Sequence, residues 1–320
     1  MLREMVKKSF WYVCLVIVLG LMAWGLSVMS KRIDYVWYWN RIPQYFFFTG
    51  QIEKFASEDG KLSINSSNET HTEVTLHYDI GTTEIFEVET ESLTFKDGDR
   101  FTDVDKIGEL EVFSKGILIV GLITTLEISL YSSVIGLIIG LFTGLARISK
   151  NPLIKGLSTI YVEVIRGTPL LVQIFIFYFF LGTILQFGRF AAGTMALSFF
   201  AGAYVAEIIR AGIQSVHPGQ MEAARSLGMN YIQTMTYIIL PQAFKRTMPP
   251  LAGQFISLIK DSSLVSVIAI TDLTKAAREI STSTFATFEV FFTIAGMYLV
   301  LTFSLSMLVR YIERRFAVSD

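Results

Sequence analysis

The chain has 320 residues, of which 52% are hydrophobic and 17% charged, and its formal net charge is −1. Ordinary soluble domains are about one quarter charged, so this composition favours a membrane protein over a soluble one. With a single cysteine, Cys14, the chain cannot form a disulfide framework within itself. Its three histidines, His71, His77 and His217, are scattered and give no metal-ligand spacing. We therefore expect no metal site, and the sequence predicts no nucleic-acid partner.

Six apolar runs are long enough to cross a membrane, because about 20 apolar residues span about 30 Å of hydrocarbon. In chain order they cover about residues 10–29, 116–146, 160–185, 190–209, 252–272 and 290–312. The residues from Arg166 to Pro169 interrupt the third run. The first run is longer than the apolar part of a secretory signal and lacks an A-x-A-like cleavage site, so we expect residues 1–30 to form a retained anchor.

Basic residues gather in three short segments that the six spans place on one side of the membrane. They are Arg147, Lys150 and Lys155 after the second run, Arg210, Arg225, Lys245 and Arg246 after the fourth, and Arg310, Arg314 and Arg315 at the end. The positive-inside rule then predicts a multi-pass protein with both termini in the cytoplasm. Residues 31–115 fall outside, and there 17 acidic residues stand against 9 basic ones.

The external segment has two predicted parts. Residues 35–48 are crowded with aromatic side chains, which is typical of a helix lying at the headgroup level. Residues 53–112 are polar, with apolar residues at alternate positions and a turn at Gly81, so we predict a small β-rich insert. The alternating residues are Leu62 and Ile64, Val74, Leu76 and Tyr78, Phe86 and Val88, and Leu93 and Phe95.

The polar connection between the fourth and fifth spans predicts two short helices joined by a turn. Pro218 suits the first turn of a helix, and Glu222 lies near that start, where the helix dipole favours an acid. Gly228 can adopt the left-handed conformation that ends a helix. We expect a second helix from Tyr231 that is stopped by Pro241.

This connection resembles the EAA loop of ABC importer permeases in residue type and spacing together. The resemblance rests on Glu222, Ala223, Ala224, Gly228 and Pro241. Four further motifs resemble the polar amino-acid uptake permeases, whose fold is of type I and MetI-like. They are RGTPLLVQIF (166–175), AYVAEIIRAGIQSV (203–216), LPQAF (240–244) and KDSSLVSVIA (260–269). The anchor at 1–30 and the insert within 31–115 depart from the usual five-span pattern.

The resemblance implies an all-α polytopic protein in the bacterial inner membrane, and the six apolar runs predict six transmembrane helices. Five of them would form a type I permease core over residues 116–316, and residues 211–250 would contain the coupling loop. Glu222, Ala223, Ala224, Gly228 and Pro241 would couple it to a dimer of ATPase subunits. A second permease subunit, identical or homologous, would complete the pathway, and a periplasmic or surface binding protein would deliver the amino acid.

The sequence itself carries no sign of catalysis. It has no nucleophile–base pair and no phosphate-binding GxxxxGK[ST] loop, so we expect no cofactor on this chain and ATP bound by the partner subunits. Two other functions account for only part of the sequence. A membrane receptor would explain residues 1–146 but not the later spans, and a secondary transporter would not need a docking loop.

Ionisable residues in the fifth span point to a substrate site, since each costs about 2.5–3.5 kcal/mol at membrane depth. On a helix Gln254, Ser257, Leu258 and Asp261 share one face over about 10 Å. We hypothesise that Asp261 receives the substrate ammonium and that Gln254 contacts its side chain, with Ser257 beside them. The alternative is that Lys260 and Asp261 pair with neighbouring helices.

Other features of the spans refine this hypothesis. The neutral amide of Gln254 favours glutamine-like, glutamate-like or small neutral substrates over cationic ones. Arg166 could meet a substrate carboxylate, but contact with backbone carbonyls or lipid headgroups is the favoured role. Gly136, Gly140 and Gly144 form a small-residue face that lets another helix approach, more readily within the subunit than at a dimer seam.

Overall fold

The computed structural model describes residues 16–18, 20–21, 24–25, 27–28, 30–68 and 70–316, without the side chains of 312–316. The chain divides into two units, Met1–Arg41 and Ile42–Asp320. In the first unit the described residues between 16 and 32 are helical. The predicted anchor over residues 1–30 and Cys14 lie mostly outside the described residues, so that prediction stays open.

The prediction of an interfacial helix over residues 35–48 is wrong. The segment contains two single 3₁₀ turns, Trp39–Arg41 and Pro43–Tyr45, and Phe47 already begins a strand. Pro43 explains the break, because a proline has no N–H to continue the preceding turn but fits the first position of a new one.

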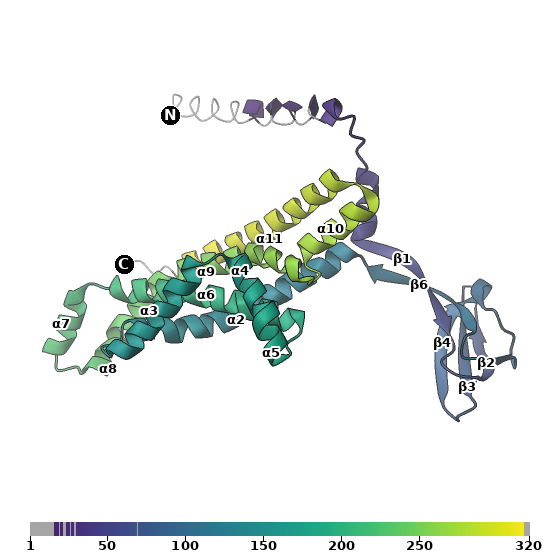
Figure 1. The fold of residues 1–320 in the computed structure, drawn as a ribbon, viewed down its shortest axis with the longest axis horizontal. Helices are drawn as coiled ribbons and strands as arrows, with labels where there is room; N and C mark the ends of the chain where they lie inside the picture. Colours follow the sequence, from purple (N-terminus) through teal and green to yellow (C-terminus); the bar gives the residue numbers. More distant parts are fainter. Residues whose placement is uncertain are drawn as a thin grey trace. The chain divides into compact units, whose positions relative to one another are not determined.

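Six strands lie between Phe47 and Lys115 (Figure 1). They are β1 (Phe47–Phe55), β2 (Gly60–Ser67), β3 (His71–Tyr78), β4 (Thr83–Glu89), β5 (Arg100–Phe101) and β6 (Lys106–Lys115). β1 and β6 form an antiparallel ribbon that starts with the pair Phe47 and Lys115, next to the first helix of the second unit. The other four strands form one antiparallel sheet in the order β4-β3-β2-β5.

The sheet has a small core of its own. Leu62, Val74, Leu76 and Val88, which lie on alternate positions of β2, β3 and β4, are buried. Leu93 and Phe95 are not in a strand, so that part of the β prediction is wrong, although both pack against this core. Two apolar residues around one polar residue also fit an extended loop, so this short alternation does not by itself indicate a strand.

From Ile117 to Phe316 the chain is mostly helical (Figure 1). The helices are α2 (Ile117–Arg147), α3 (Pro152–Gly167), α4 (Leu170–Phe175), α5 (Thr183–Leu185), α6 (Arg189–Gln214), α7 (Pro218–Ser226), α8 (Tyr231–Thr234), α9 (Leu240–Asp261), α10 (Leu273–Thr284) and α11 (Thr287–Phe316). Two π-helical turns, Ile176–Gly182 and Met235–Ile239, and the 3₁₀ helix Ser262–Ile268 join some of them.

Within the described residues, four helical stretches are long and apolar enough to cross a membrane. They are Ile117–Arg147, Arg189–Gln214, Tyr231–Ile268 and Thr287–Tyr311. The pair Pro152–Gly167 and Leu170–Leu185 passes the same test together but is bent by 107°. This pair covers the third predicted span, whose interruption at Arg166 to Pro169 is thus a sharp bend.

Helices α2 and α6 pack closely through the predicted small-residue face. Gly136, Gly140 and Gly144 are buried, and a Cβ atom at Gly140 would lie only 2.4 Å from the Cβ atom of Val205 on α6. The face therefore packs within the subunit, as the sequence favoured.

Two expectations about the fifth span are wrong. Pro241 does not stop the helix, which continues from Tyr231 to Ile268. The π-helical turn Met235–Ile239 precedes Pro241, and such a wide turn shifts the hydrogen-bond register at the position where the proline lacks its donor. The span also ends before residue 272, because Asp272 caps the unpredicted helix α10 by accepting from Thr274 N at 3.0 Å and from Lys275 N at 2.9 Å.

Candidate functional site

Helix α7, the predicted coupling helix, has a defined start and end. The ring Nδ1 of His217 accepts the N–H of Gly219 at 3.1 Å, so the first turn is capped. At the end, Gly228 has φ +83° and donates to Arg225 O at 2.9 Å, while Met229 N donates to Ala224 O at 3.1 Å. These two bonds form a Schellman motif, and the predicted left-handed conformation at Gly228 is confirmed.

The turn after α7 is fixed as firmly. Asn230 and Gln233 form a capping box, each side chain accepting the other's backbone N–H at 2.9 Å, and α8 begins there. Met221 of α7 packs against the buried Ile239 and Ala243, which follow in the next helix. The loop is therefore a rigid helical hairpin with its own small core.

The outer end of this hairpin is apolar and open to solvent. The side chains of Leu227, Ile232 and Tyr237 are 83%, 74% and 71% exposed. Leu227, Gly228, Met229, Gln233 and Tyr237 line a shallow hollow of about 320 Å³. Apolar side chains gathered at such a tip are typical of a surface that another protein covers.

The five predicted coupling residues do not share one role in the structure. Glu222 and Ala223 are exposed on α7, but Ala224 is buried, with 3% exposure. Gly228 ends α7, and Pro241 is exposed in the first turn of α9. Glu222 and Ala223 can thus touch a partner, whereas Ala224 and Gly228 hold the shape that presents them.

The predicted substrate residues lie where the helical spacing puts them. Gln254, Ser257 and Asp261 are half-buried in α9, and Leu258 between them is buried in the main core. Among the residues that the structure describes, neither Lys260 nor Asp261 forms an ion pair with a neighbouring helix, so the alternative role has no such pair to support it. The substrate role of these residues stays a prediction.

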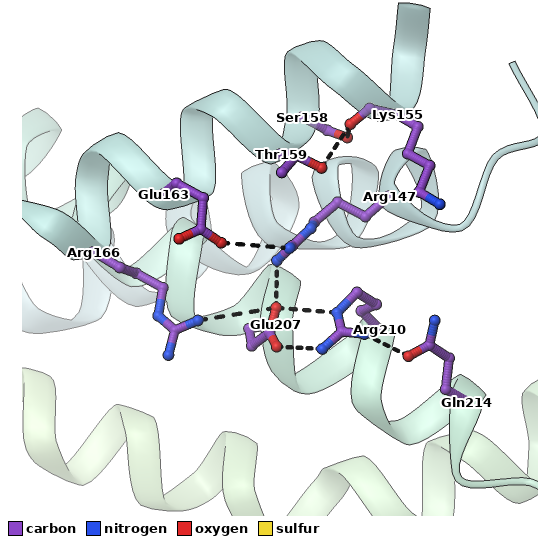
Figure 2. Close-up of polar contacts among 9 residues, drawn as sticks. All are labelled: Arg147, Lys155, Ser158, Thr159, Glu163, Arg166, Glu207, Arg210 and Gln214. Atoms are coloured by element: carbon purple, nitrogen blue, oxygen red, sulfur yellow. Dashed lines mark hydrogen bonds and ion pairs between the residues drawn. The ribbon is translucent and has the colours of Figure 1, made fainter. Parts of the chain in front are cut away.

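Sequence reasoning missed a cluster of charged side chains around Glu207 of α6 (Figure 2). Arg147, the last residue of α2, and Arg210 of α6 both donate hydrogen bonds to its carboxylate, the Nε atom of Arg210 at 3.1 Å. Arg166 of α3 lies 4.0 Å from the same carboxylate, and Glu163 lies 3.7 Å from Arg147. The cluster ties α2, α3 and α6 together at the end from which α7 follows.

Glu207 could have been found from the sequence. It is an acid inside the fourth apolar run, which is costly unless it is paired, and Arg210 follows one turn later. Its other partners come from distant segments. The guanidinium of Arg166 lies by Glu207 and 5.3 Å above the ring of Tyr204, which the sequence did not predict. Its expected contact with lipid headgroups stays a prediction.

The bend between α3 and α4 is braced by a buried glutamine. Gln173 is 4% exposed, and its Nε2 donates to Ile165 O at 2.7 Å, to Thr168 O at 3.1 Å and to Thr168 Oγ1 at 2.8 Å. Pro169 has no N–H, so the helix cannot continue across the bend, and Gln173 satisfies carbonyls at the end of α3.

Comparisons with known proteins agree with this architecture. Residues 136–318 match the family described as "Binding-protein-dependent transport system inner membrane component". The chain is 47% identical over 192 residues to the "Probable glutamine ABC transporter permease protein GlnM" of Bacillus subtilis, covering 58% of this chain and 89% of the relative. It is 42% identical over 197 residues to the "L-cystine transport system permease protein TcyB" of the same organism, covering 61% and 84%.

A solved structure, "Crystal structure of an amino acid ABC transporter with histidines", is 46% identical with a TM-score of 0.59 and covers 62% of this chain and 94% of its own. The resemblance to ABC importer permeases is therefore confirmed. The family match begins at residue 136, so the β strands and the N-terminal segment lie outside it. The chain belongs to the family of binding-protein-dependent transport system inner membrane components.

Proposed function

We propose that this chain moves polar amino acids into the cytoplasm as one of two permease subunits, identical or homologous, of an ABC importer. The observation that carries the proposal is the hairpin at α7, a capped helix with an exposed apolar tip, in a chain similar to amino-acid permeases. A dimer of ATPase subunits would cover that tip and hydrolyse ATP. A binding protein would deliver the substrate, and the two permeases would alternate between outward-open and inward-open states.

The proposed topology has six spans with both termini in the cytoplasm. Four long helices and the bent pair give five crossings, and the anchor over residues 1–30 would be the sixth. With the bent pair counted as one span, the end of α2, the hairpin at α7 and the C-terminus all fall on one side. The basic clusters at these three places support the cytoplasmic assignment, which puts the six strands outside.

Thiol labelling tests this topology. Cysteines replace Ser226 on the hairpin and Val104 of the strand region, both exposed, in a chain whose Cys14 is changed to serine. We expect an impermeant reagent to label position 104 in cells whose cytoplasmic membrane is intact and whose outer membrane has been permeabilised. Position 226 should be labelled only after the cytoplasmic membrane is permeabilised as well. Labelling of position 226 in intact cells would overturn the topology.

The substrate is proposed as a polar amino acid, with glutamine-like, glutamate-like or neutral side chains favoured over cationic ones. The neutral amide of Gln254 on the face with Ser257 and Asp261 supports this choice, as do relatives named for glutamine and cystine. The structure compared above is described as a transporter with histidines, so amino acids with basic side chains, including histidine, belong in the assay.

Uptake by the reconstituted complex is the decisive experiment. The chain, its ATPase subunits and its binding protein are placed in proteoliposomes and given a panel of labelled amino acids, with ATP or a non-hydrolysable analogue inside. We expect ATP-dependent uptake of polar neutral or amide side chains and none with the analogue. Uptake that follows an ion gradient without ATP would identify a secondary transporter instead.

A further inference from the structure

The end of α6 joins the Glu207 cluster to the coupling hairpin. Gln214, the last residue of α6, follows Glu207 by seven positions, which is about 10 Å of helix, and α7 begins at Pro218. Arg210 donates to both Glu207 and Gln214. A displacement of α7 therefore acts first on the part of α6 that carries the cluster.

The last turn of α3 is held from two directions. Arg166 faces Glu207 on α6, and Gln173 of α4 donates to the carbonyl of Ile165 in the same turn (Figure 2 shows the first contact). Beyond Gly167 only Thr168 and Pro169, both extended, separate α3 from α4 before the chain turns by 107°. A pull on Arg166 is thus applied directly at the bend.

The three arginines hold Glu207 with different strengths. Arg147 and Arg210 donate hydrogen bonds to it, and their side chains are 11% and 28% exposed. Arg166 has the longest contact, 4.0 Å, without a hydrogen bond, and its side chain is 38% exposed. Exposed pairs of that kind contribute little, so this contact can be made and broken while the other two keep Glu207 charged and oriented.

The bend itself has an unused hydrogen-bond acceptor. The Oε1 atom of Gln173 is buried and has no partner among the described residues. The amide orientation is set by its neighbours, since Thr168 Oγ1 donates to Val164 O and can only accept from Gln173. A buried unpaired acceptor is unfavourable, so an arrangement of the bend that supplied a donor to this atom would remove that cost.

We propose that Glu207 is a positioning residue which, through its contact with Arg166, links the movement of α7 to the bend between α3 and α4. This inference rests on the proposed docking of α7 on the ATPase subunits. When α7 moves, α6 carries Glu207 relative to Arg166, and the contact that ties α3 to α6 changes while Arg147 keeps α2 attached. The angle between α3 and α4 would then change with the nucleotide state of the ATPase subunits.

The test uses Arg166→Gln in the complete complex with its ATPase subunits and binding protein. This change leaves Arg147 and Arg210 on Glu207, so we expect normal assembly and basal ATP hydrolysis. We expect the ratio of substrate-stimulated to basal hydrolysis to fall by about fivefold, with uptake falling in parallel. Glu163→Gln is the matched control, because it removes only an exposed partner of Arg147 and should leave the ratio unchanged.

A direct measurement of the bend separates positioning from mere stability. Spin labels at Leu157 on α3 and Phe179 beyond the bend, both exposed, report the distance between the two arms with and without trapped nucleotide. We expect a nucleotide-dependent shift in the parent and in Glu163→Gln, and none in Arg166→Gln. Tyr204→Leu, which removes the ring under Arg166 but keeps its charge, should retain the shift.

The outcomes also distinguish this inference from the proposed docking. If a strained variant at Gly228 uncouples transport but Arg166→Gln has a normal ratio and a normal shift, the role of Glu207 is overturned and the docking stands. If neither variant changes coupling, the docking itself fails.

Discussion

At the scale of single residues, Gly228 has a role that only its backbone can fill. Its φ of +83° costs a β-branched residue roughly 1–2 kcal/mol, and no atom within 4 Å would meet an added Cβ, so the penalty is conformational. We expect Gly228→Val to insert and assemble but to lose most substrate-stimulated ATP hydrolysis, because the end of α7 is displaced. Gly228→Asn is the control, since asparagine tolerates this conformation and should stay close to the parent.

Glu222 tests the docking surface rather than the hairpin's shape. It is exposed on α7, and its side chain makes no ion pair among the described residues. We expect Glu222→Lys to leave thermal stability unchanged while weakening association with the ATPase subunits, as measured by their co-purification and by stimulated hydrolysis. Unchanged association and hydrolysis would remove Glu222 from the docking surface.

Asp261 tests the proposed substrate face. Losing a charge-assisted hydrogen bond costs about 1.5–3 kcal/mol, so Asp261→Asn should lower the apparent affinity for substrate by roughly 10- to 100-fold. The control is the exposed neighbouring residue Lys260, and Lys260→Gln should leave the affinity for substrate unchanged. Equal effects of the two changes, or none, would contradict a substrate contact at Asp261. The measurement is equilibrium binding of labelled substrate to the purified permease complex without its binding protein.

At the scale of elements, helices α2 and α6 pack closely against each other through small residues of α2. A methyl group at Gly140 would lie 2.4 Å from both Cβ and Cγ1 of Val205. We expect Gly140→Ala to lower the stability of the subunit by about 1–3 kcal/mol, seen as a lower midpoint of thermal unfolding in detergent. Gly156→Ala on α3, where nothing lies within 4 Å, should be neutral or slightly stabilising.

A double variant checks the cause of that loss. Val205→Ala removes Cγ1, one of the two Val205 atoms that the added methyl group at position 140 would strike, and keeps Cβ. The double variant should therefore recover only part of the unfolding midpoint that Gly140→Ala loses. A loss that the second change does not reduce would place the effect of Gly140→Ala elsewhere.

At the scale of the whole molecule, the strands of residues 47–115 lie outside residues 136–318, which match the family. Their sheet has a core separate from the helical clusters, and the β1–β6 ribbon connects it to α2. We propose that this insert contacts the binding protein or the second permease, because acidic residues exceed basic ones 17 to 9 in residues 31–115 and would attract a basic surface.

Excision of the insert tests that proposal. Gly50 pairs with Val112 in the ribbon, so residues 51–111 can be replaced by Asn-Gly, which favours the tight turn of a two-stranded hairpin. We expect assembly and basal ATP hydrolysis to persist and the affinity for the binding protein to fall, most clearly at low salt. Unchanged affinity, assembly and uptake would leave the insert without a role in transport.

A milder variant separates charge from the loss of the domain. Glu73 and Glu87 lie directly opposite each other on β3 and β4, and both are exposed. Like charges in such a cross-strand pair oppose each other, so Glu73→Gln with Glu87→Gln should preserve or raise the stability of the sheet. A lower affinity for the binding protein in this variant would then come from the lost charge.

The sequence by itself determined the features that depend on local rules. Apolar length placed three long helices and the bent pair, and it located the fifth span without its bounds. The backbone preference of Gly228 placed the end of α7. The small residues at Gly136, Gly140 and Gly144 also predicted their packing within the subunit. Each of these features depends on a few neighbouring positions, so no distant segment was needed to read it.

Only the tertiary structure decided which distant side chains meet. Glu207 gathers arginines from α2, α3 and its own helix, and no local spacing predicts that set. Pro241 is carried through a continuous helix because the turn before it is π-helical. The tendency of a proline to stop a helix is a local preference, and it is overruled when packing against other helices supplies compensating contacts. That packing exists only once the chain has folded.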